Sequence, residues 1–380
     1  MGRWLMRLAI VSDFPDDPGI FTGGVAGVVV TLAETLHRLY GIDIHILSQS
    51  HRGADTVTKW NGITVHRINQ GRYPGFVYYW TGLRHKIQER LRKINPDIVH
   101  FHGLAGITLN YRGRYVFTVH GINEKDVFYK GGPFIGLRAG IIRKVEEAGR
   151  RRAGNLIIIS PYIFHQIRDQ IRGKTWMIEN PVSALFFSVA GEVKLPRVLF
   201  IGSIIPRKNL LGLLAGVRRV LEAGKALSLN VIGPFADRKY FETCLDYVDS
   251  HGLKEAVSFL GPLSSSAIRD EFTHASCLAL LSHQETAPLV VGEAMAAGVP
   301  VLGFQGCGLP FMVEDGVTGY LVRVCDCDEI AQKLILLSSR ATSARMGRAC
   351  KAVASRRFHP EIVARKTMET YKEILDSDQT

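Results

Sequence analysis

The sequence predicts an α/β protein made of two doubly wound domains, each with a parallel sheet covered by helices on both faces. Three observations lead to this fold class. The chain has 380 residues, a length that suits two domains of ordinary size better than a single core. Short β-branched apolar runs alternate with stretches of helical period, as parallel strands joined by helical crossovers require. This alternation stops over residues 181–196 and then starts again.

The predicted strands divide between the two halves of the chain. In the first domain, residues 1–180, apolar runs of strand length lie at 8–11, 44–47, 98–101, 115–119 and 156–159. Residues 181–196 have no sustained period, and we expect them to form the interdomain linker. In the second domain, residues 197–360, strands are predicted at 198–201, 229–232, 257–260, 277–281, 299–303 and 319–322. Helical period returns at 361–375.

One helix of the first domain is both amphipathic and basic. Leu83, Ile87, Leu91 and Ile94 recur at helical spacing with Arg and Lys between them, and the following Asn-Pro pair ends the helix. A second basic stretch lies at 138–152. Aromatic residues also precede the helix, and they are Tyr73, Phe76, Tyr78, Tyr79 and Trp80. Together they suit a surface that lies against a membrane. They equally suit aromatics that pack on the domain or line an acceptor groove, with the charges solvated.

Charge is concentrated in the first domain. The formal net charge is +12, and residues 1–180 hold 25 Lys and Arg against 14 Asp and Glu, a net +11. Such a half would attract phosphates, anionic lipid headgroups or an acidic acceptor. We expect no nucleic-acid partner, because no nucleic-acid-binding motif is present.

The sequence also predicts a cytoplasmic protein, with peripheral contact to the cytoplasmic face of the membrane as an open alternative. Residues 1–13 have too short an apolar run for a signal peptide or a membrane span. Six cysteines, all in the second half, lack the paired spacing of a zinc site, so we expect free thiols; they are Cys244, Cys277, Cys307, Cys325, Cys327 and Cys350.

The most informative segment is ETAPLVVGEAMAAGVPV at 285–301. Its order is loop, helix and strand, with Pro288 placed for the first turn of the helix and Gly298 placed to end it. A helix that starts at the carboxyl edge of a sheet offers free N–H groups to a pyrophosphate, here those of Leu289 and Val290. Glu293 lies about one turn into this helix, where its carboxylate suits the diol of a ribose.

Two glutamates separated by seven residues in this context resemble the signature of the retaining family 4 glycosyltransferases, which have the GT-B fold. Further blocks resemble this family in the same order over nearly the whole chain: GGV at 23–25, INPDIVHFHG at 94–103, TVHG at 118–121, ISPY at 159–162, ENPV at 179–182, FIGSIIPRKN at 200–209, VIGP at 231–234, FLGPLS at 259–264 and EDGVTGYLV at 314–322. The resemblance implies two Rossmann-like domains facing a cleft. The first domain would bind the acceptor and the second would bind the nucleotide sugar. It also implies that the last helix crosses back, so that 361–380 completes the first domain.

The resemblance assigns roles to four polar side chains. Lys208, with Arg207 beside it, would bind the donor phosphates and stabilise charge on the leaving diphosphate, which replaces a metal ion. Glu285 would contact hydroxyls of the transferred sugar and Glu293 those of the ribose. His120 would touch the sugar near its reacting carbon.

Glycines and main-chain groups complete the predicted donor site. Gly23 and Gly24 form a loop in which backbone can approach a ligand. Main-chain groups from Leu260 to Leu263 would frame the base. His100 and His102, in an apolar strand, are interpreted as structural.

Two positions depart from the family pattern. Ser203 stands where many relatives have an arginine, which puts one phosphate contact in doubt. Phe311 stands where relatives often have a glutamate that contacts the donor sugar, and a phenylalanine has no acceptor for such a contact.

The predicted reaction is metal-independent transfer, with retention, of a hexose-type sugar from a nucleoside diphosphate, UDP or GDP, to a hydroxyl of a glycan, lipid-linked or small-molecule acceptor. No cofactor is expected. Asp326 and Asp328 match the DxD pattern of metal-dependent transferases, but they precede a helical run and are interpreted as a helix cap. Two alternatives stay open: an epimerase of nucleotide sugars on the same fold, and a nucleotide-binding protein without turnover.

Overall fold

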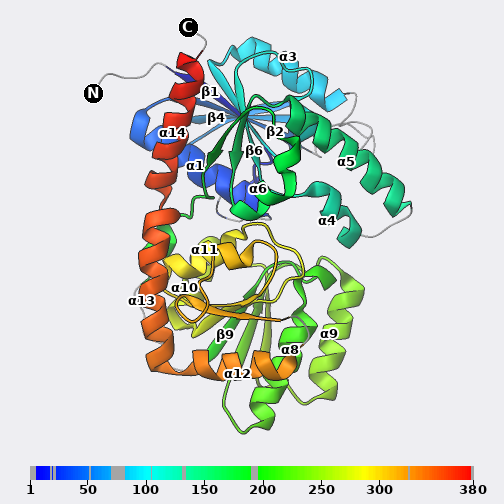
Figure 1. The fold of residues 1–380 in the computed structure, drawn as a ribbon, viewed down its shortest axis with the longest axis vertical. Coiled ribbons are helices and arrows are strands. Elements are labelled where there is room, and N and C mark those ends of the chain that lie inside the picture. Colours follow the sequence, from blue (N-terminus) through cyan, green and yellow to red (C-terminus); the bar gives the residue numbers. More distant parts are fainter. Residues whose placement is uncertain are drawn as a thin grey trace. The chain divides into compact units, whose positions relative to one another are not determined.

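The computed structural model describes residues 6–17, 19, 23–50, 53–69, 82–103, 105–130, 134–189, 196–323 and 326–377. The chain forms two compact units of similar size (Figure 1). The first unit consists of Met1–Pro181 together with Pro360–Thr380, and the second is Val182–His359. No helix among the described residues is both long and apolar enough to cross a membrane.

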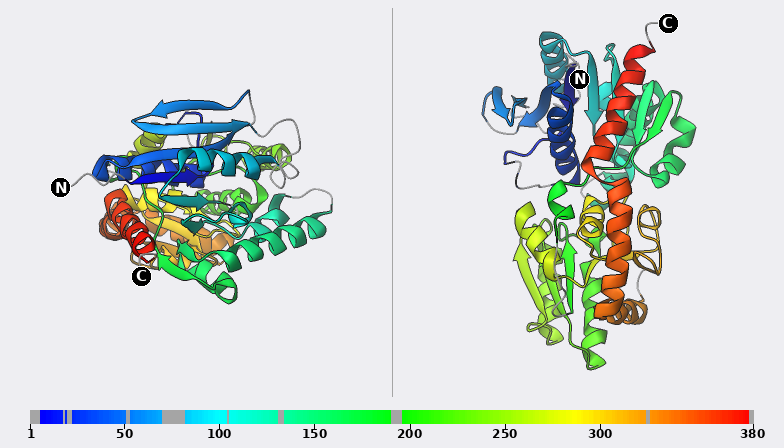
Figure 2. Two further views of the ribbon diagram at one scale, coloured as in Figure 1. Left: turned by 90° about the horizontal axis from the view of Figure 1, so that it is seen from above. Right: turned by 90° about the vertical axis from the view of Figure 1, so that its left-hand side faces the viewer.

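The first unit is built on an eight-stranded sheet in the order β3-β4-β2-β1-β5-β6-β7-β8. Its strands are β1 (Arg7–Val11), β2 (Asp43–Ser50), β3 (Thr56–Trp60), β4 (Ile63–Asn69), β5 (Ile98–His102), β6 (Tyr115–Val119), β7 (Asn155–Ile158) and β8 (Lys174–Met177). All neighbouring strands are parallel except β3 and β4, which form an antiparallel hairpin at one edge, visible in both views of Figure 2. The five strands expected from the sequence are all present within this sheet.

The apolar pattern did not predict three strands of this sheet, namely β3 and β8 at its two edges and β4 beside β3. β3 and β8 expose most of their side chains, so they lack the continuous apolar run that marks a buried strand. The hairpin nevertheless has a local signal. Its turn is Asn61-Gly62, and both residues have positive φ, as a two-residue hairpin turn requires.

Helices cover both faces of the first sheet. They are α1 (Gly24–Tyr40), α3 (Arg84–Ile94), α4 (Asn123–Lys130), α5 (Ile135–Arg152), α6 (Pro161–Ile167) and α14 (Pro360–Asp376), with short 3-10 turns η2 (Ala105–Thr108) and η3 (Arg168–Gln170). The C-terminal helix α14 packs beside α1, as Figure 1 shows, and buries Val363, Ala364 and Tyr371 in the core of this unit. The end of the chain therefore belongs to the first unit.

The second unit has a six-stranded sheet, parallel throughout, in the order β11-β10-β9-β12-β13-β14. The strands are β9 (Arg197–Ile201), β10 (Ser228–Ile232), β11 (Val257–Gly261), β12 (Cys277–Leu280), β13 (Val301–Phe304) and β14 (Gly319–Val322). Its helices are α7 (Ala184–Phe187), α8 (Leu210–Glu222), α9 (Arg238–Ser250), α10 (Ser265–His274), α11 (Leu289–Ala296), α12 (Cys327–Ser338) and α13 (Arg340–Arg357), with 3-10 turns η4 (Pro206–Lys208) and η5 (Leu309–Phe311).

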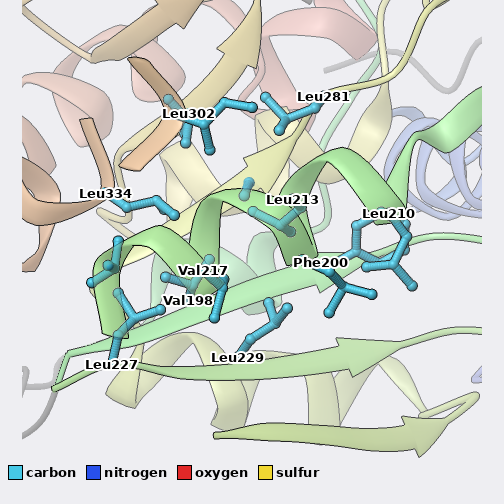
Figure 3. Packing of buried hydrophobic residues seen from close by; sticks show 14 of the residues in the cluster. Val198, Phe200, Leu210, Leu213, Val217, Leu227, Leu229, Leu281, Leu302 and Leu334 are labelled. Carbon is cyan, nitrogen blue, oxygen red and sulfur yellow. The ribbon is translucent and has the colours of Figure 1, made fainter. Parts of the chain in front are cut away.

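The core of the second unit explains why its strands were visible in the sequence. Figure 3 shows Leu213 and Val217 of α8 directed onto Val198 and Phe200 of β9. Because helices cover both faces of the sheet, nearly every side chain of β9 is apolar and buried. The predicted fold class, two parallel-sheet Rossmann-like units, is confirmed.

The expected linker over 181–196 differs from the structure. Residues from Val182 onward belong to the second unit, where Phe186 and Val189 lie in the core and the Val182 amide donates to the Phe358 carbonyl at 2.9 Å. The segment contains α7, whose four residues are too few to show helical period in a sequence. Residues 190–195 lie outside the described residues.

Candidate functional site

The second sheet changes direction between β9 and β12. From β9 the chain proceeds outward through β10 and β11, and it returns to β12 on the other side of β9 before continuing through β13 and β14. Loops that leave the carboxyl ends of the two central strands therefore diverge. In open parallel sheets this point is where ligands bind. The loop after β9 holds Arg207 and Lys208, and the loop after β12 holds Glu285.

These three side chains meet in a partly buried ion cluster. Lys208 Nζ lies 2.6 Å from Glu285 Oε1, and Arg207 Nη1 lies 3.4 Å from the same oxygen. The exposed fractions are 12% for the Lys208 side chain, 10% for Glu285 and 22% for Arg207. Two cations against one carboxylate leave a net charge of +1 in a site of low solvent access, where charge acts more strongly than in water.

Backbone hydrogen bonds join the two loops that carry the cluster. The His283 amide donates to the Arg207 carbonyl at 2.9 Å, and Arg207 Nη1 donates to the Gln284 carbonyl at 2.5 Å. Arg207 is thus bonded to the β12 loop through both its main chain and its guanidinium. This arrangement fixes the distance between Lys208 and Glu285.

A third loop, after β13, closes on the same site. The Gly308 amide donates to the Glu285 carbonyl at 2.8 Å, and a Cβ at Gly308 would lie 1.8 Å from the Thr286 oxygen. Only glycine permits this approach. Cys307 has a φ of 55° and its Sγ lies 3.2 Å from Gln284 Oε1.

Helix α11 begins beside this cluster. Pro288 is its N-cap residue and not, as expected, part of the first turn, and Leu289 and Val290 place their amides in that turn. Gly298, with φ of 78°, follows the end of the helix. Within α11, Glu293 is 8% exposed, and burial raises the pKa of its carboxyl to about 7. No described residue forms a hydrogen bond or ion pair with this carboxyl, so it is available to hydroxyl donors of a ligand.

Three further residues of the second unit, two of them leucines and one a serine, were predicted to bind the donor, and they follow or end strands β9 and β11. Ser203 follows β9 and is partly buried. Leu260, at the end of β11, is 38% exposed, whereas Leu263 packs partly against the core. Phe311, in η5 after β13, is 37% exposed.

The aspartates of the DxD pattern lie elsewhere. Asp326 caps α12, where its Oδ1 accepts from the Glu329 amide at 2.9 Å, and Asp328 forms an ion pair with Arg219 at 3.2 Å. In the described part of the chain, no group of three or more His, Cys, Asp or Glu is arranged to hold a metal ion.

The first unit holds a second cluster, made of histidines. At the carboxyl ends of β5 and β6, His102 Nδ1 lies 2.8 Å from His120 Nε2, and the two rings stack with centroids 5.1 Å apart. Burial lowers the pKa of His120 to about 4, and burial with neighbouring histidines lowers the pKa of His102 well below its usual range. Both rings are therefore neutral at physiological pH.

His100 lies on the same strand but is fully paired. Its Nδ1 lies 2.7 Å from Tyr371 Oη of α14, and its Nε2 lies 2.6 Å from Thr118 Oγ1. His102 differs, because its buried Nε2 has no hydrogen-bond partner among the described residues. A cavity of about 20 Å³ is lined by both of these histidines and His120. A purely structural role thus accounts for His100 but leaves one nitrogen of His102 unexplained.

The glycine loop and the basic segments are described only in part. Gly23 is the N-cap of α1 and Gly24 its first residue, and a Cβ at either would meet no atom of a described residue within 4 Å. The five aromatic residues at 73–80 lie outside the described residues. The basic stretch 138–152 coincides with α5, but Arg150 is not solvated: it is fully buried and pairs with Glu124 at 2.5 Å and Glu146 at 3.5 Å.

Sequence reasoning did not identify Gln284 and Gly308 as parts of the site. Gly308 had a signal in the Gly-Cys-Gly sequence at 306–308, where two glycines flank one residue. Gln284 had none, because its role depends on loops that are distant in sequence. The direct contact between Lys208 and Glu285 was likewise not predicted.

Comparisons with known proteins agree with this geometry. Residues 22–184 match the family described as "Glycosyltransferase Family 4", and residues 184–353 match "Glycosyl transferases group 1". The chain is 31% identical over 389 aligned residues to N-acetyl-alpha-D-glucosaminyl L-malate synthase of Bacillus anthracis, with 95% of this chain and 96% of the relative covered.

Two solved structures share the fold. Sucrose-phosphate synthase from Thermosynechococcus elongatus aligns with a TM-score of 0.83 at 19% identity, covering 98% of this chain and 100% of that one. HepE from Anabaena, solved in complex with UDP and glucose, aligns with a TM-score of 0.73 at 18% identity, covering 97% and 99%. With the family signature, the two matched regions and a full-length relative in agreement, the chain belongs to glycosyltransferase family 4 and is a glycosyltransferase of GT-B fold.

Proposed function

We propose that the chain transfers a hexose-type sugar from a nucleoside diphosphate donor to an acceptor hydroxyl, with retention at the anomeric carbon and without a metal ion. The observation that carries the proposal is the cluster of Lys208, Arg207 and Glu285 at the switch point of the second sheet. A leaving diphosphate needs positive charge at the moment the glycosidic bond breaks. Two fixed cations on rigid loops supply that charge where other transferases use a divalent ion.

The donor is assigned to groups of the second unit as follows. The amides of Leu289 and Val290 and the side chains of Arg207 and Lys208 would bind the diphosphate. Glu293 would accept from the ribose hydroxyls. Glu285, which shares Oε1 with both cations, would use its second oxygen for a sugar hydroxyl.

Other predicted residues would frame the rest of the donor. Main-chain groups from Leu260 to Leu263 would surround the base, Ser203 would contact a phosphate, and Gly23 and Gly24 would let backbone approach the ligand. His120 of the first unit would contact the sugar.

The proposed reaction breaks the bond between the anomeric carbon and the diphosphate oxygen. The acceptor oxygen forms its bond to the same carbon on the face that the diphosphate leaves, and the acceptor proton passes to a diphosphate oxygen. This route needs no protein nucleophile, so the chain's contribution is to position the reactants and neutralise charge.

The donor base is proposed to be uracil or guanine. HepE was solved with UDP and glucose, which supports UDP as the first to test. A thermal-shift panel with UDP, GDP, ADP and TDP would rank the bases, because a bound nucleotide stabilises the folded state by mass action. The relative from Bacillus anthracis is by name a glucosaminyl malate synthase, so small anionic hydroxy acids belong in the acceptor screen beside glycans and lipid-linked acceptors.

Incubation of the best donor with these acceptors tests the reaction class. We expect product whose anomeric proton, seen by NMR, has the donor's configuration, formed equally in EDTA. An inverted product would refute retention, and loss of turnover in EDTA that Mg²⁺ restores would refute metal independence. Epimerised free sugar without acceptor, or binding without any turnover, would instead support one of the two alternatives.

Contact with an anionic membrane is a further part of the proposal. Phe128 of α4, the α5 N-cap residue Phe134 and Leu137 of α5 are 58%, 79% and 66% exposed. The exposed Arg138 and Lys144 follow along α5. Exposed apolar side chains beside cations suit a bilayer with anionic headgroups. We expect the wild-type protein to sediment with vesicles of phosphatidylcholine and phosphatidylglycerol. The double variant F134S/L137S should stay in solution, whereas F164S, at a partly exposed position on α6, should sediment as the wild type does. Equal sedimentation of all three would refute this surface.

A further inference from the structure

The histidine cluster of the first unit contains one nitrogen that its neighbours do not explain. His102 is 5% exposed, and its buried Nε2 has no hydrogen-bond partner in the part of the chain that the structure describes. The other nitrogen, Nδ1, lies 2.8 Å from His120 Nε2. Because both rings are neutral, only one of these two facing nitrogens carries a proton. The direction of this hydrogen bond therefore decides which nitrogen of His120 is protonated.

Two arrangements are possible. In the first, His102 donates from Nδ1, its Nε2 is an unpaired lone pair, and His120 carries its proton on Nδ1. In the second, His120 donates from Nε2, and the buried Nε2 of His102 is an unpaired N–H group. Buried N–H groups without an acceptor are rarer in folded proteins than acceptors without a donor. The first arrangement is thus favoured.

The surroundings of His102 hold its ring in place. Its ring lies tilted against that of His100, with centroids 4.0 Å apart, and His100 is fixed by Thr118 of β6 and Tyr371 of α14. The His102 ring also stacks on that of His120. These contacts are hydroxyl and ring contacts without a formal charge, so they fix the position of His102 without protonating it. Figure 1 shows α14 and β6 within the same unit.

We infer that His102 is a positioning residue that donates from Nδ1 to His120 Nε2 and thereby makes His120 a hydrogen-bond donor at Nδ1. The kinetic consequence rests on the proposed role of His120 at the sugar. A donor at this position can hold a sugar hydroxyl or ring oxygen, whereas it cannot act as a base toward the acceptor. His120 would then orient the donor in turnover, and His102 would set the protonation state that makes this possible.

Three substitutions at His102 separate donation from packing. H102N offers an amide N–H near the position of Nδ1 and should keep the hydrogen bond to His120. H102D offers only acceptors when ionised and should place the His120 proton on Nε2. H102L removes the interaction. We expect H102N to stay within a few-fold of wild-type kcat, and H102D and H102L to lose about tenfold to a hundredfold, the scale for removing a group that orients a functional histidine. The KM for the donor should change little.

His100 supplies the matched control. It lies two residues earlier on β5, is likewise buried, and hydrogen-bonds to Tyr371 and Thr118 where His102 bonds to His120. H100N should therefore lower thermal stability about as much as H102N without changing kcat by more than a few-fold. If H100N and H102L lowered kcat equally, a general packing effect would explain both, and the inference would be wrong.

Nitrogen-15 NMR of histidine-labelled protein tests the inference without turnover. The His120 signals, assigned by their loss in H120N, should show the proton on Nδ1 in the wild type and H102N, and on Nε2 in H102D. A proton on Nε2 in the wild type would overturn the inference. This measurement needs no soluble H102L. If H120A retained full activity while the NMR result held, the proposed role of His120 would fail but the hydrogen-bond direction would stand.

Discussion

Replacing Lys208 with methionine tests the charge cluster directly. The substitution keeps most of the side chain's length and apolar stem but removes the charge that lies 2.6 Å from Glu285 Oε1. It changes the net charge of the cluster from +1 to 0. Removing one preorganised group that stabilises transition-state charge typically costs about 3 to 4 kcal/mol, or about a hundredfold to a thousandfold in kcat. We expect a loss of this size, with a smaller change in the KM for the donor.

The same substitution has a predictable effect on stability. Breaking a buried ion pair costs about 3 to 5 kcal/mol when the remaining charge has no other partner. Glu285 is 10% exposed and keeps Arg207 at 3.4 Å, so we expect a smaller cost, about 2 kcal/mol. For a unit of this size that corresponds to a fall in Tm of about 4 to 8 °C.

A double-mutant cycle with E285Q distinguishes these two effects. In K208M/E285Q the carboxylate that lost its nearer cation is gone, so much of the lost Tm should return while turnover stays low. Alone, E285Q should raise the affinity for the bare nucleoside diphosphate, because it removes a negative charge beside both cations, and it should still lower turnover.

The assay is sugar transfer with the best donor, beside calorimetry of UDP binding. K254M is the charge control, because Lys254 is 67% exposed on the same unit. A K208M variant with kcat/KM within threefold of both wild type and K254M would refute the role of Lys208. Recovery of turnover in the double variant would show that Lys208 acts only by neutralising Glu285.

Three further predictions concern the surrounding residues. Between its ordinary pKa of 4.5 and its folded-state pKa of about 7, Glu293 keeps a proton in the folded protein that the unfolded chain releases, so stability falls as pH rises through this range. The Tm of E293Q relative to wild type should therefore increase from pH 5 to pH 8, by the equivalent of up to about 3 kcal/mol in unfolding free energy. A constant difference in Tm would contradict this. G308A places a Cβ 1.8 Å from the Thr286 oxygen, so the loops after β12 and β13 must separate. We expect donor binding, measured by calorimetry, to weaken at least about tenfold. Wild-type affinity would show that donor binding does not need the close contact of these two loops. D326A should lower the free energy of unfolding, measured by denaturant titration, by about 1 kcal/mol because it removes a helix cap. Its turnover in EDTA should be unchanged. A large loss of turnover would support the interpretation of Asp326 as a metal ligand.

The parts of the fold that the sequence predicted are those buried on both faces. β9 and β6 appear as continuous apolar runs because helices cover each side of the sheet. The edge strands β3 and β8 were missed for the opposite reason, since an exposed edge strand has no continuous apolar run. β4 is buried, but polar residues separate its apolar ones. α7 was missed because four residues show no period.

The candidate site divides in a similar way. The two glutamates and the pair of Arg207 and Lys208 could be predicted because each pattern lies within a short segment of sequence. Both segments follow parallel strands, which places them at the same edge of the sheet. The hydrogen bond from His102 to His120 joins residues on two strands, and its geometry depends on the register of β5 with β6, in which His102 pairs with Thr118. A strand register of this kind has no local signature in one sequence.

The two clusters differ in charge, and the difference follows from what surrounds each. Lys208, Arg207 and Glu285 keep partial access to solvent and compensate one another, so the second unit can hold a net positive charge at low cost. Burial lowers the pKa values of His100, His102 and His120 and keeps all three rings neutral, although Glu179 lines the same cavity. A nucleotide sugar presents the matching pair of demands, because its diphosphate requires cations whereas its sugar hydroxyls are best held by neutral donors and acceptors. A protonated histidine at the sugar would repel the positive charge that develops on the anomeric carbon as the diphosphate leaves. Burial of the histidine cluster is therefore a requirement of the proposed chemistry, and introducing a carboxylate at His102 should impair turnover even in a fully folded variant.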